Sequence, residues 1–79
     1  MKNNELLNSL PQDAKIEALE TLKYFTDCHI FIRNGKYEVS TGIAITSHYN
    51  INEKYLGRLK IDDVYTKEEQ EKNYKEAWG

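Results

Sequence analysis

The chain has 79 residues, of which 39% are hydrophobic and 30% are charged, and its formal net charge is −2 at neutral pH. These values are typical of one folded domain and differ from the low hydrophobicity and high net charge of disordered chains. A domain of this size buries roughly 60% of its unfolded surface, which leaves little room for a deep, water-excluding active site. We therefore expect a single domain over residues 1–79 that binds a partner, is not an enzyme and carries no cofactor.

Cys28 is the only cysteine, so no intrachain disulfide can form, and no apolar run approaches the length of a signal-peptide core or a membrane span. We expect a cytoplasmic protein without membrane contact. The charge is uneven: residues 1–27 carry −2, residues 28–61 carry +3 and residues 62–79 carry −3. The small net charge argues against a DNA mimic or a general nucleic-acid-binding protein.

An amphipathic helix is predicted between Gln12 and about Phe25. Upstream of it, Leu6, Leu7 and Leu10 also have the spacing of a helix. The helix from Gln12 has an apolar stripe on one side and its charged residues mainly on the other, so we expect it to cover one face of a sheet. Its apolar stripe consists of Ile16, Ala18, Leu19, Leu22 and Phe25.

A β-hairpin is predicted around Asn34-Gly35, because both residue types tolerate the positive φ that a type I′ turn requires. This turn pairs Arg33 with Lys36, Phe31 with Glu38, Ile32 with Tyr37 and Ile30 with Val39. Side chains alternate between the faces of a strand, so one face is apolar and the other is charged. The apolar face holds Ile30, Ile32, Tyr37 and Val39, and the charged face holds His29, Phe31, Arg33, Lys36 and Glu38.

The second strand can extend through Thr46, and a third strand is predicted over Tyr55–Ile61. In the third strand Tyr55, Gly57, Leu59 and Ile61 should point inward and Leu56, Arg58 and Lys60 outward. A capping box at Thr66-Lys67-Glu68-Glu69 predicts a last helix from about Lys67 to Trp78. We predict the α+β fold class, with elements in the order α-β-β-β-α. The three strands form an antiparallel meander, with the N-terminal helix on one face and a C-terminal helix after the last strand. The order of the strands within the sheet and the place of the last helix stay open.

The charged sheet face is the first candidate site. It should collect Phe31, Arg33, Lys36, Arg58 and Lys60 beside His29, with Glu38 as its only acid. Cations around an aromatic ring bind phosphates and stacked bases, so this face is a candidate for binding a nucleotide or single-stranded nucleic acid. Three alternatives are an ordinary solvated face, a face covered by the last helix so that Tyr74 and Trp78 bury Phe31, and a protein interface around Phe31 and Leu56.

Metal binding and nucleophilic catalysis have few candidate residues. Cys28, His29 and His48 are the only soft ligands, and neighbouring strand residues such as Cys28 and His29 point to opposite faces. The acids Asp62, Asp63, Glu68 and Glu69 resemble a cation site, but they also fit the positive end of a helix dipole. We predict no metal site and no catalytic residue.

The last helix has a thin apolar face at Tyr74, Ala77 and Trp78, so it either packs on its own domain or offers Tyr74 and Trp78 to a partner. The tail, from Asp62 to Gln70 and from Asn73 to Trp78, in a short acidic chain rich in Lys, Asn, Tyr and Ile, resembles small accessory proteins of phages and prophages of low-GC Gram-positive bacteria. The resemblance implies a protein that inhibits or modulates host machinery, including anti-defence proteins. We therefore predict a homodimeric protein that binds a host protein, with nucleotide binding as the alternative.

Overall fold

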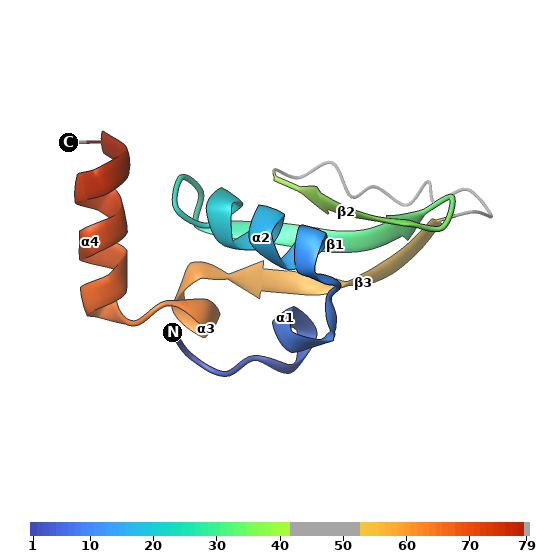
Figure 1. Cartoon of the computed structure of the whole chain (residues 1–79), viewed down its shortest axis with the longest axis horizontal. Coiled ribbons are helices and arrows are strands. Elements are labelled where there is room, and N and C mark those ends of the chain that lie inside the picture. The colour runs from blue at the N-terminus through green and yellow to red at the C-terminus, as the bar shows by residue number, and fades with distance from the viewer. Residues whose placement is uncertain (42–52, 79) are drawn as a thin grey trace.

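The computed structural model describes residues 1–41 and 53–78. The helices are α1 (Glu5–Ser9), α2 (Gln12–Thr21), α3 (Ile61–Val64) and α4 (Lys67–Trp78), and the strands are β1 (Asp27–Arg33), β2 (Lys36–Ser40) and β3 (Glu53–Lys60) (Figure 1). The predicted α+β class and the order α-β-β-β-α are confirmed. The short helix α3, directly after β3, was not predicted. The expected extension of the second strand through Thr46 lies largely outside the described residues.

Within the described residues, the strands form one three-stranded antiparallel sheet in the order β2-β1-β3. β1 is the central strand and pairs with β2 on one side and β3 on the other. The predicted hairpin register is confirmed, since Ile30 pairs with Val39 and Arg33 with Lys36. Asn34 and Gly35 have φ angles of 52° and 78°, as a type I′ turn requires.

The hairpin turn depends on Gly35. Its φ is 78°, and apart from Gly35 and its two chain neighbours no described residue has an atom within 4 Å of the place where a Cβ would stand. A larger residue therefore meets only the backbone cost of this conformation, about 1–2 kcal/mol. We expect Gly35→Val to lower the free energy of unfolding in urea by that amount, and Gly35→Asn, which tolerates positive φ, to lower it less. An unchanged urea midpoint for the valine variant would contradict this turn.

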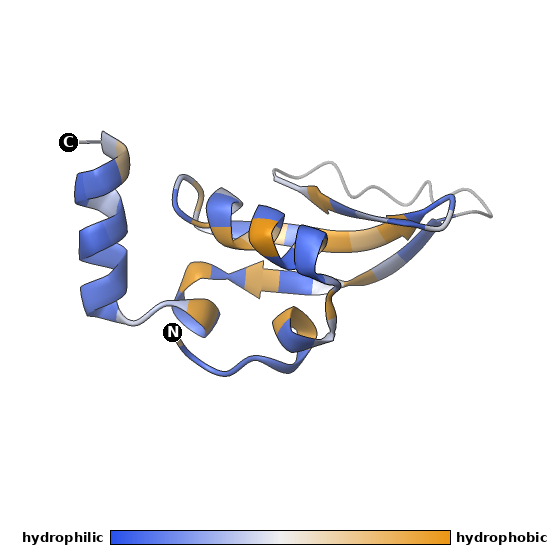
Figure 2. Cartoon of the chain, viewed as in Figure 1, coloured by the Kyte–Doolittle hydropathy of each residue, from blue (hydrophilic) through white to orange (hydrophobic). Residues whose placement is uncertain are grey.

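The core lies between the sheet and the N-terminal helices, where the apolar segments of α1, α2 and β1 meet (Figure 2). Along α2, Ala14 and Ala18 are buried, and Leu22 continues this stripe. Two members of the predicted stripe are wrong, because Ile16 and Phe25 are each 52% exposed. Ile16 lies two residues from Ala14 and therefore on the opposite side of the helix, and Phe25 follows the end of α2. The sheet and α3 complete the core with Cys28, Ile30, Leu59, Val64 and Tyr65.

A β-bulge in β3 changes which side chains face the core. Ile30 pairs with Gly57 and Phe31 pairs with Tyr55, so Leu56 is an extra residue without a partner in the register. An extra residue reverses the alternation of side chains along a strand. Tyr55 therefore shares the outer face with Phe31, and Leu56 packs against the core. The predicted inward Tyr55 and outward Leu56 are wrong, whereas the inward Leu59 is confirmed.

Helix α4 projects from the end of the molecule, beyond α3 and away from the strands (Figure 1). The predicted capping box is confirmed, because the Thr66 N–H donates to Glu69 Oε1 at 2.9 Å and the Glu69 N–H donates to Thr66 Oγ1 at 3.2 Å. None of the described residues of α4 is buried, and its surface is largely hydrophilic (Figure 2). α4 therefore does not cover the outer sheet face. Across residues 1–41 and 53–78, the helices lack the length and apolarity needed to cross a membrane.

Candidate interaction surface

The outer sheet face centres on Phe31 and Arg33. Phe31 is only 7% exposed, and the Arg33 guanidinium lies 4.8 Å from the centroid of its ring. Arg33 Nε is 2.8 Å from Glu53 Oε1, and Arg33 Nη1 is 3.0 Å from Glu38 Oε2. The ring is thus covered, and the cation above it is bonded to two carboxylates.

Arg58 is also bonded to a carboxylate, at the other end of β1: Arg58 Nε donates to Asp27 Oδ2 at 2.6 Å. The expectation that Glu38 is the only acid on this face is therefore wrong. β1 begins at Asp27, and β3 begins at Glu53, before the predicted start at Tyr55, and each start brings a carboxylate beside an arginine. In the strand register, Lys36 lies opposite Arg33 near the turn, whereas Lys60 lies opposite Asp27 at the other end of the sheet. The structure thus spreads the predicted cations along the strands and does not gather them.

Cys28 is fully buried in the core, and this burial raises the pKa of its thiol to about 11. The reactive thiolate is therefore scarce at neutral pH. We expect the folded protein to react with a thiol reagent such as Ellman's reagent much more slowly than the urea-unfolded chain. Equal rates in the two states would contradict the buried position of Cys28. Because the raised pKa favours the neutral thiol, Cys28 supports folding below about pH 9 and this support decreases as the pH rises toward 11.

The other residues that were weighed as metal ligands, and set aside, are placed as follows. The His29 Nδ1 atom is 3.0 Å from the Tyr55 hydroxyl oxygen, on the outer face, and His48 lies outside the described residues. Asp62 accepts a hydrogen bond from Gln70 Nε2 at 2.9 Å and lies 3.5 Å from Lys67 Nζ. The bond from Gln70 first, and the charge of Lys67 second, hold the pKa of Asp62 below its ordinary value. No cluster of metal-ligating side chains is found in the described part of the chain.

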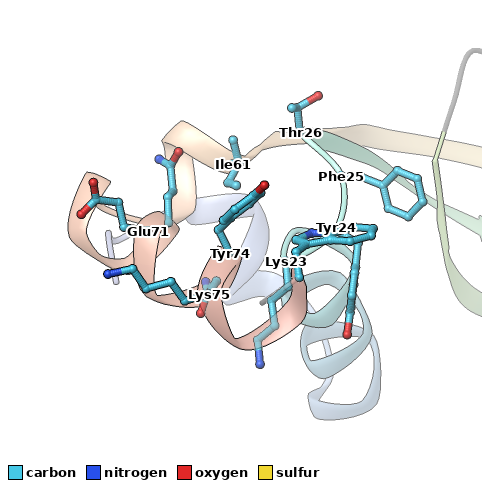
Figure 3. Close-up of a pocket in the computed structure, with 11 residues that line it drawn as sticks. Lys23, Tyr24, Phe25, Thr26, Ile61, Glu71, Tyr74 and Lys75 are labelled. Atoms are coloured by element: carbon cyan, nitrogen blue, oxygen red, sulfur yellow. The ribbon is translucent and has the colours of Figure 1, made fainter.

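A groove lies between α4 and the segment Lys23–Thr26, which connects α2 to β1 (Figure 3). Its volume is about 630 Å³. The rings of Tyr24 and Trp78 meet edge to face, with their centroids 5.7 Å apart. Aromatic side chains around the groove remain largely exposed: Tyr24 at 50%, Phe25 at 52%, Tyr74 at 65% and Trp78 at 61%. We call Tyr24, Phe25, Tyr74 and Trp78 the α4 surface.

Backbone and side-chain hydrogen bonds hold the two walls of the groove in place. The Ile61 N–H donates to the Thr26 carbonyl at 2.8 Å, which joins the start of α3 to the loop before β1. The buried Tyr65 hydroxyl donates to the Leu19 carbonyl at 3.1 Å, and Gln70 Nε2 donates to the Tyr65 carbonyl at 3.2 Å. These contacts connect α2, α3 and the first turn of α4. The position of α4 is thus fixed at its base, while Tyr74 and Trp78 near its other end stay exposed.

No match to this chain was found among protein-family models, curated proteins or solved structures. Function is therefore inferred from the surfaces of the molecule. Tyr74 and Trp78 were predicted as binding residues, and the structure brings them together at the groove. Tyr24 and Phe25 were missed, because Phe25 fits the spacing of the preceding helix and Tyr24 is joined to Trp78 only by the tertiary fold. Exposed aromatics that surround a groove are suited to anchoring another macromolecule rather than to bond chemistry.

Proposed function

We propose that this chain is a non-enzymatic binding protein that acts by protein–protein contact through the α4 surface. The observation that supports this proposal is the grouping of Tyr24, Phe25, Tyr74 and Trp78 around one groove while each stays at least half exposed. Clustered exposed aromatics are unfavourable in water and mark interaction sites, where Tyr and Trp are enriched. The groove offers a hollow for an anchor residue, and the rings around it exclude water from such a contact.

The resemblance of the tail to phage accessory proteins supports a role in the cytoplasm of a bacterium. On this proposal the chain inhibits or modulates a host macromolecule, for example as an anti-defence protein. Helix α4 contributes the resembling segment Asn73–Trp78, which is also where Tyr74 and Trp78 lie. The part of the sequence that carries the resemblance thus coincides with the exposed aromatic surface.

Binding of a nucleotide or single-stranded nucleic acid by the outer sheet face receives less support. A phosphate would have to compete with Glu53 and Glu38 for Arg33 and with Asp27 for Arg58. A base would also have to displace the Arg33 guanidinium to reach Phe31. Both steps cost charge-assisted contacts, which disfavours this function.

Site-specific photo-crosslinking in bacterial cells tests the proposed function. The photoreactive residue p-benzoylphenylalanine replaces Tyr74 in one variant and Tyr37, a 38% exposed residue on β2, in the matched control. We expect a defined protein adduct from position 74 and none from position 37. Absence of any adduct at position 74, or the same adducts at both positions, would overturn the proposal. The mass of the adduct also identifies the partner, since one copy of this chain adds 9.3 kDa.

A further inference from the structure

We propose that the partner on the α4 surface is a second copy of this chain, with the two α4 helices packed antiparallel about a two-fold axis. This inference rests on the proposed function, because it uses the same contact surface and names a second copy as the protein bound there, so a host macromolecule would be contacted by the other faces of the dimer. It commits to a symmetric dimer in which Tyr74 and Trp78 of each copy face the helix of the other. The geometry of α4, its charges and its exposed area support it.

One side of α4 is available for such a contact. Gln70 and Asn73 are half-buried on the side that faces the rest of the molecule. Residues three, four, seven or eight apart share one side of a helix. By this spacing an exposed side of α4 at the edge of the groove carries Lys67, Glu71, Tyr74, Lys75 and Trp78, and all of these except Lys67 also line the groove. The two aromatics are therefore flanked along the helix by charges of both signs.

The charges on this side complement each other only in the antiparallel arrangement. A two-fold axis near residue 73 places Glu71 of one copy opposite Lys75 of the other, and symmetry repeats this pair. A parallel arrangement would oppose Glu71 to Glu71 and Lys75 to Lys75, which is repulsive. Neither Glu71 nor Lys75 forms an ion pair with another described residue, so both are available to a second copy.

The exposed aromatic area of α4 fits a small dimer interface. Tyr74 and Trp78 each leave about 100 Å² in water, since a buried aromatic covers about 150–250 Å² and both rings are more than half exposed. Over two copies this is roughly 400 Å², to which the stems of Glu71 and Lys75 add, so the contact belongs to the small interfaces below about 1,200 Å² that form weak complexes. Because α4 stands apart from the strands (Figure 1), the dimer leaves both sheets uncovered.

Charge-reversal variants of the full chain test this dimer by native mass spectrometry and sedimentation equilibrium. The wild type should form a species of twice 9.3 kDa. Glu71→Lys and Lys75→Glu should each weaken the dimer roughly tenfold or more, because each places like charges opposite each other twice. When the two variants are mixed, they should form a heterodimer, because the two positive charges on one chain then face the two negative charges on the other. Mixing cannot repair an effect within one helix, so this result separates the interface from helix stability.

Several results would overturn the inference. A wild-type chain that stays at 9.3 kDa up to high micromolar concentration has no such dimer. A wild-type dimer that both variants retain, or a mixture without preferred heterodimer, places the contact on another surface. If the chain is monomeric and position 74 crosslinks to a different protein, the second copy is excluded and the proposed function stands. If position 74 gives no adduct at all, the proposed function fails as well.

Discussion

Leu22→Ala should lower the free energy of unfolding by about 2–5 kcal/mol, the range for leucine deletions in well-packed cores. Leu22 has no exposed surface and follows the buried residues Ala14 and Ala18 on the inner side of α2. A domain of this length has a total stability of about 4–12 kcal/mol, so the variant loses a large part of it. Urea unfolding followed by circular dichroism measures the change. Leu22→Val removes less volume and should lower the free energy of unfolding by less. This variant still gives a measurable change in stability if the alanine variant does not fold.

Ile16→Ala is the matched control on the same helix. Ile16 belongs to the apolar stripe that the sequence predicts, yet it is 52% exposed. Its replacement should change the free energy of unfolding by less than about 1 kcal/mol, since little apolar area returns to water and alanine favours the helix. A larger loss for Ile16→Ala than for Leu22→Ala would contradict the observed orientation of α2.

The double variant Tyr74→Ala/Trp78→Ala should weaken protein contact by at least about a hundredfold, because each aromatic anchor contributes about 2 kcal/mol or more at the centre of an interface. Its effect on folding should be small, since none of the described residues of α4 is buried. The lost ring contact between Trp78 and Tyr24 costs about 0.5–1.5 kcal/mol. Sedimentation equilibrium measures the contact and thermal unfolding measures the fold.

Tyr37→Ala is the control for these two substitutions. Tyr37 is also a partly exposed tyrosine, but it lies on β2, away from α4. Its removal should leave the dissociation constant of the dimer unchanged. A double variant that assembles as the wild type does, or a Tyr37→Ala variant that is equally impaired, would show that the α4 surface is not the contact.

Much of the fold could be predicted because its signals are local. Asn34-Gly35 fixes the hairpin and its register, since the turn type determines which residues pair. Thr66 and Glu69 fix the start of α4 in the same way, through hydrogen bonds within one turn of chain. Each of these features depends on neighbours in the sequence and on no distant residue.

The rest depends on contacts between distant segments. The bulge at Leu56 arises where α1 meets β3: Gly57 has a φ of 152°, and a Cβ there would lie 2.9 Å from Leu6 Cδ2. No alternation pattern reveals such a bulge, so the predicted facing of Tyr55 was wrong. The groove likewise needs the Ile61–Thr26 hydrogen bond, which joins residues from separate parts of the chain. Tyr74 and Trp78 were recognised as exposed aromatics, whereas their neighbours across the groove were not.

Trp78 offers the most direct test that the α4 surface is a contact between copies. It is the only tryptophan in the chain and is 61% exposed in the monomer, so its fluorescence reports on this surface alone. Acrylamide quenching is measured as the full-length protein is concentrated from submicromolar to high micromolar levels. We expect quenching to fall severalfold and the emission to move to shorter wavelength, whereas the Glu71→Lys variant stays quenched until the Lys75→Glu variant is added. Quenching typical of an exposed indole at every concentration would contradict the proposed dimer.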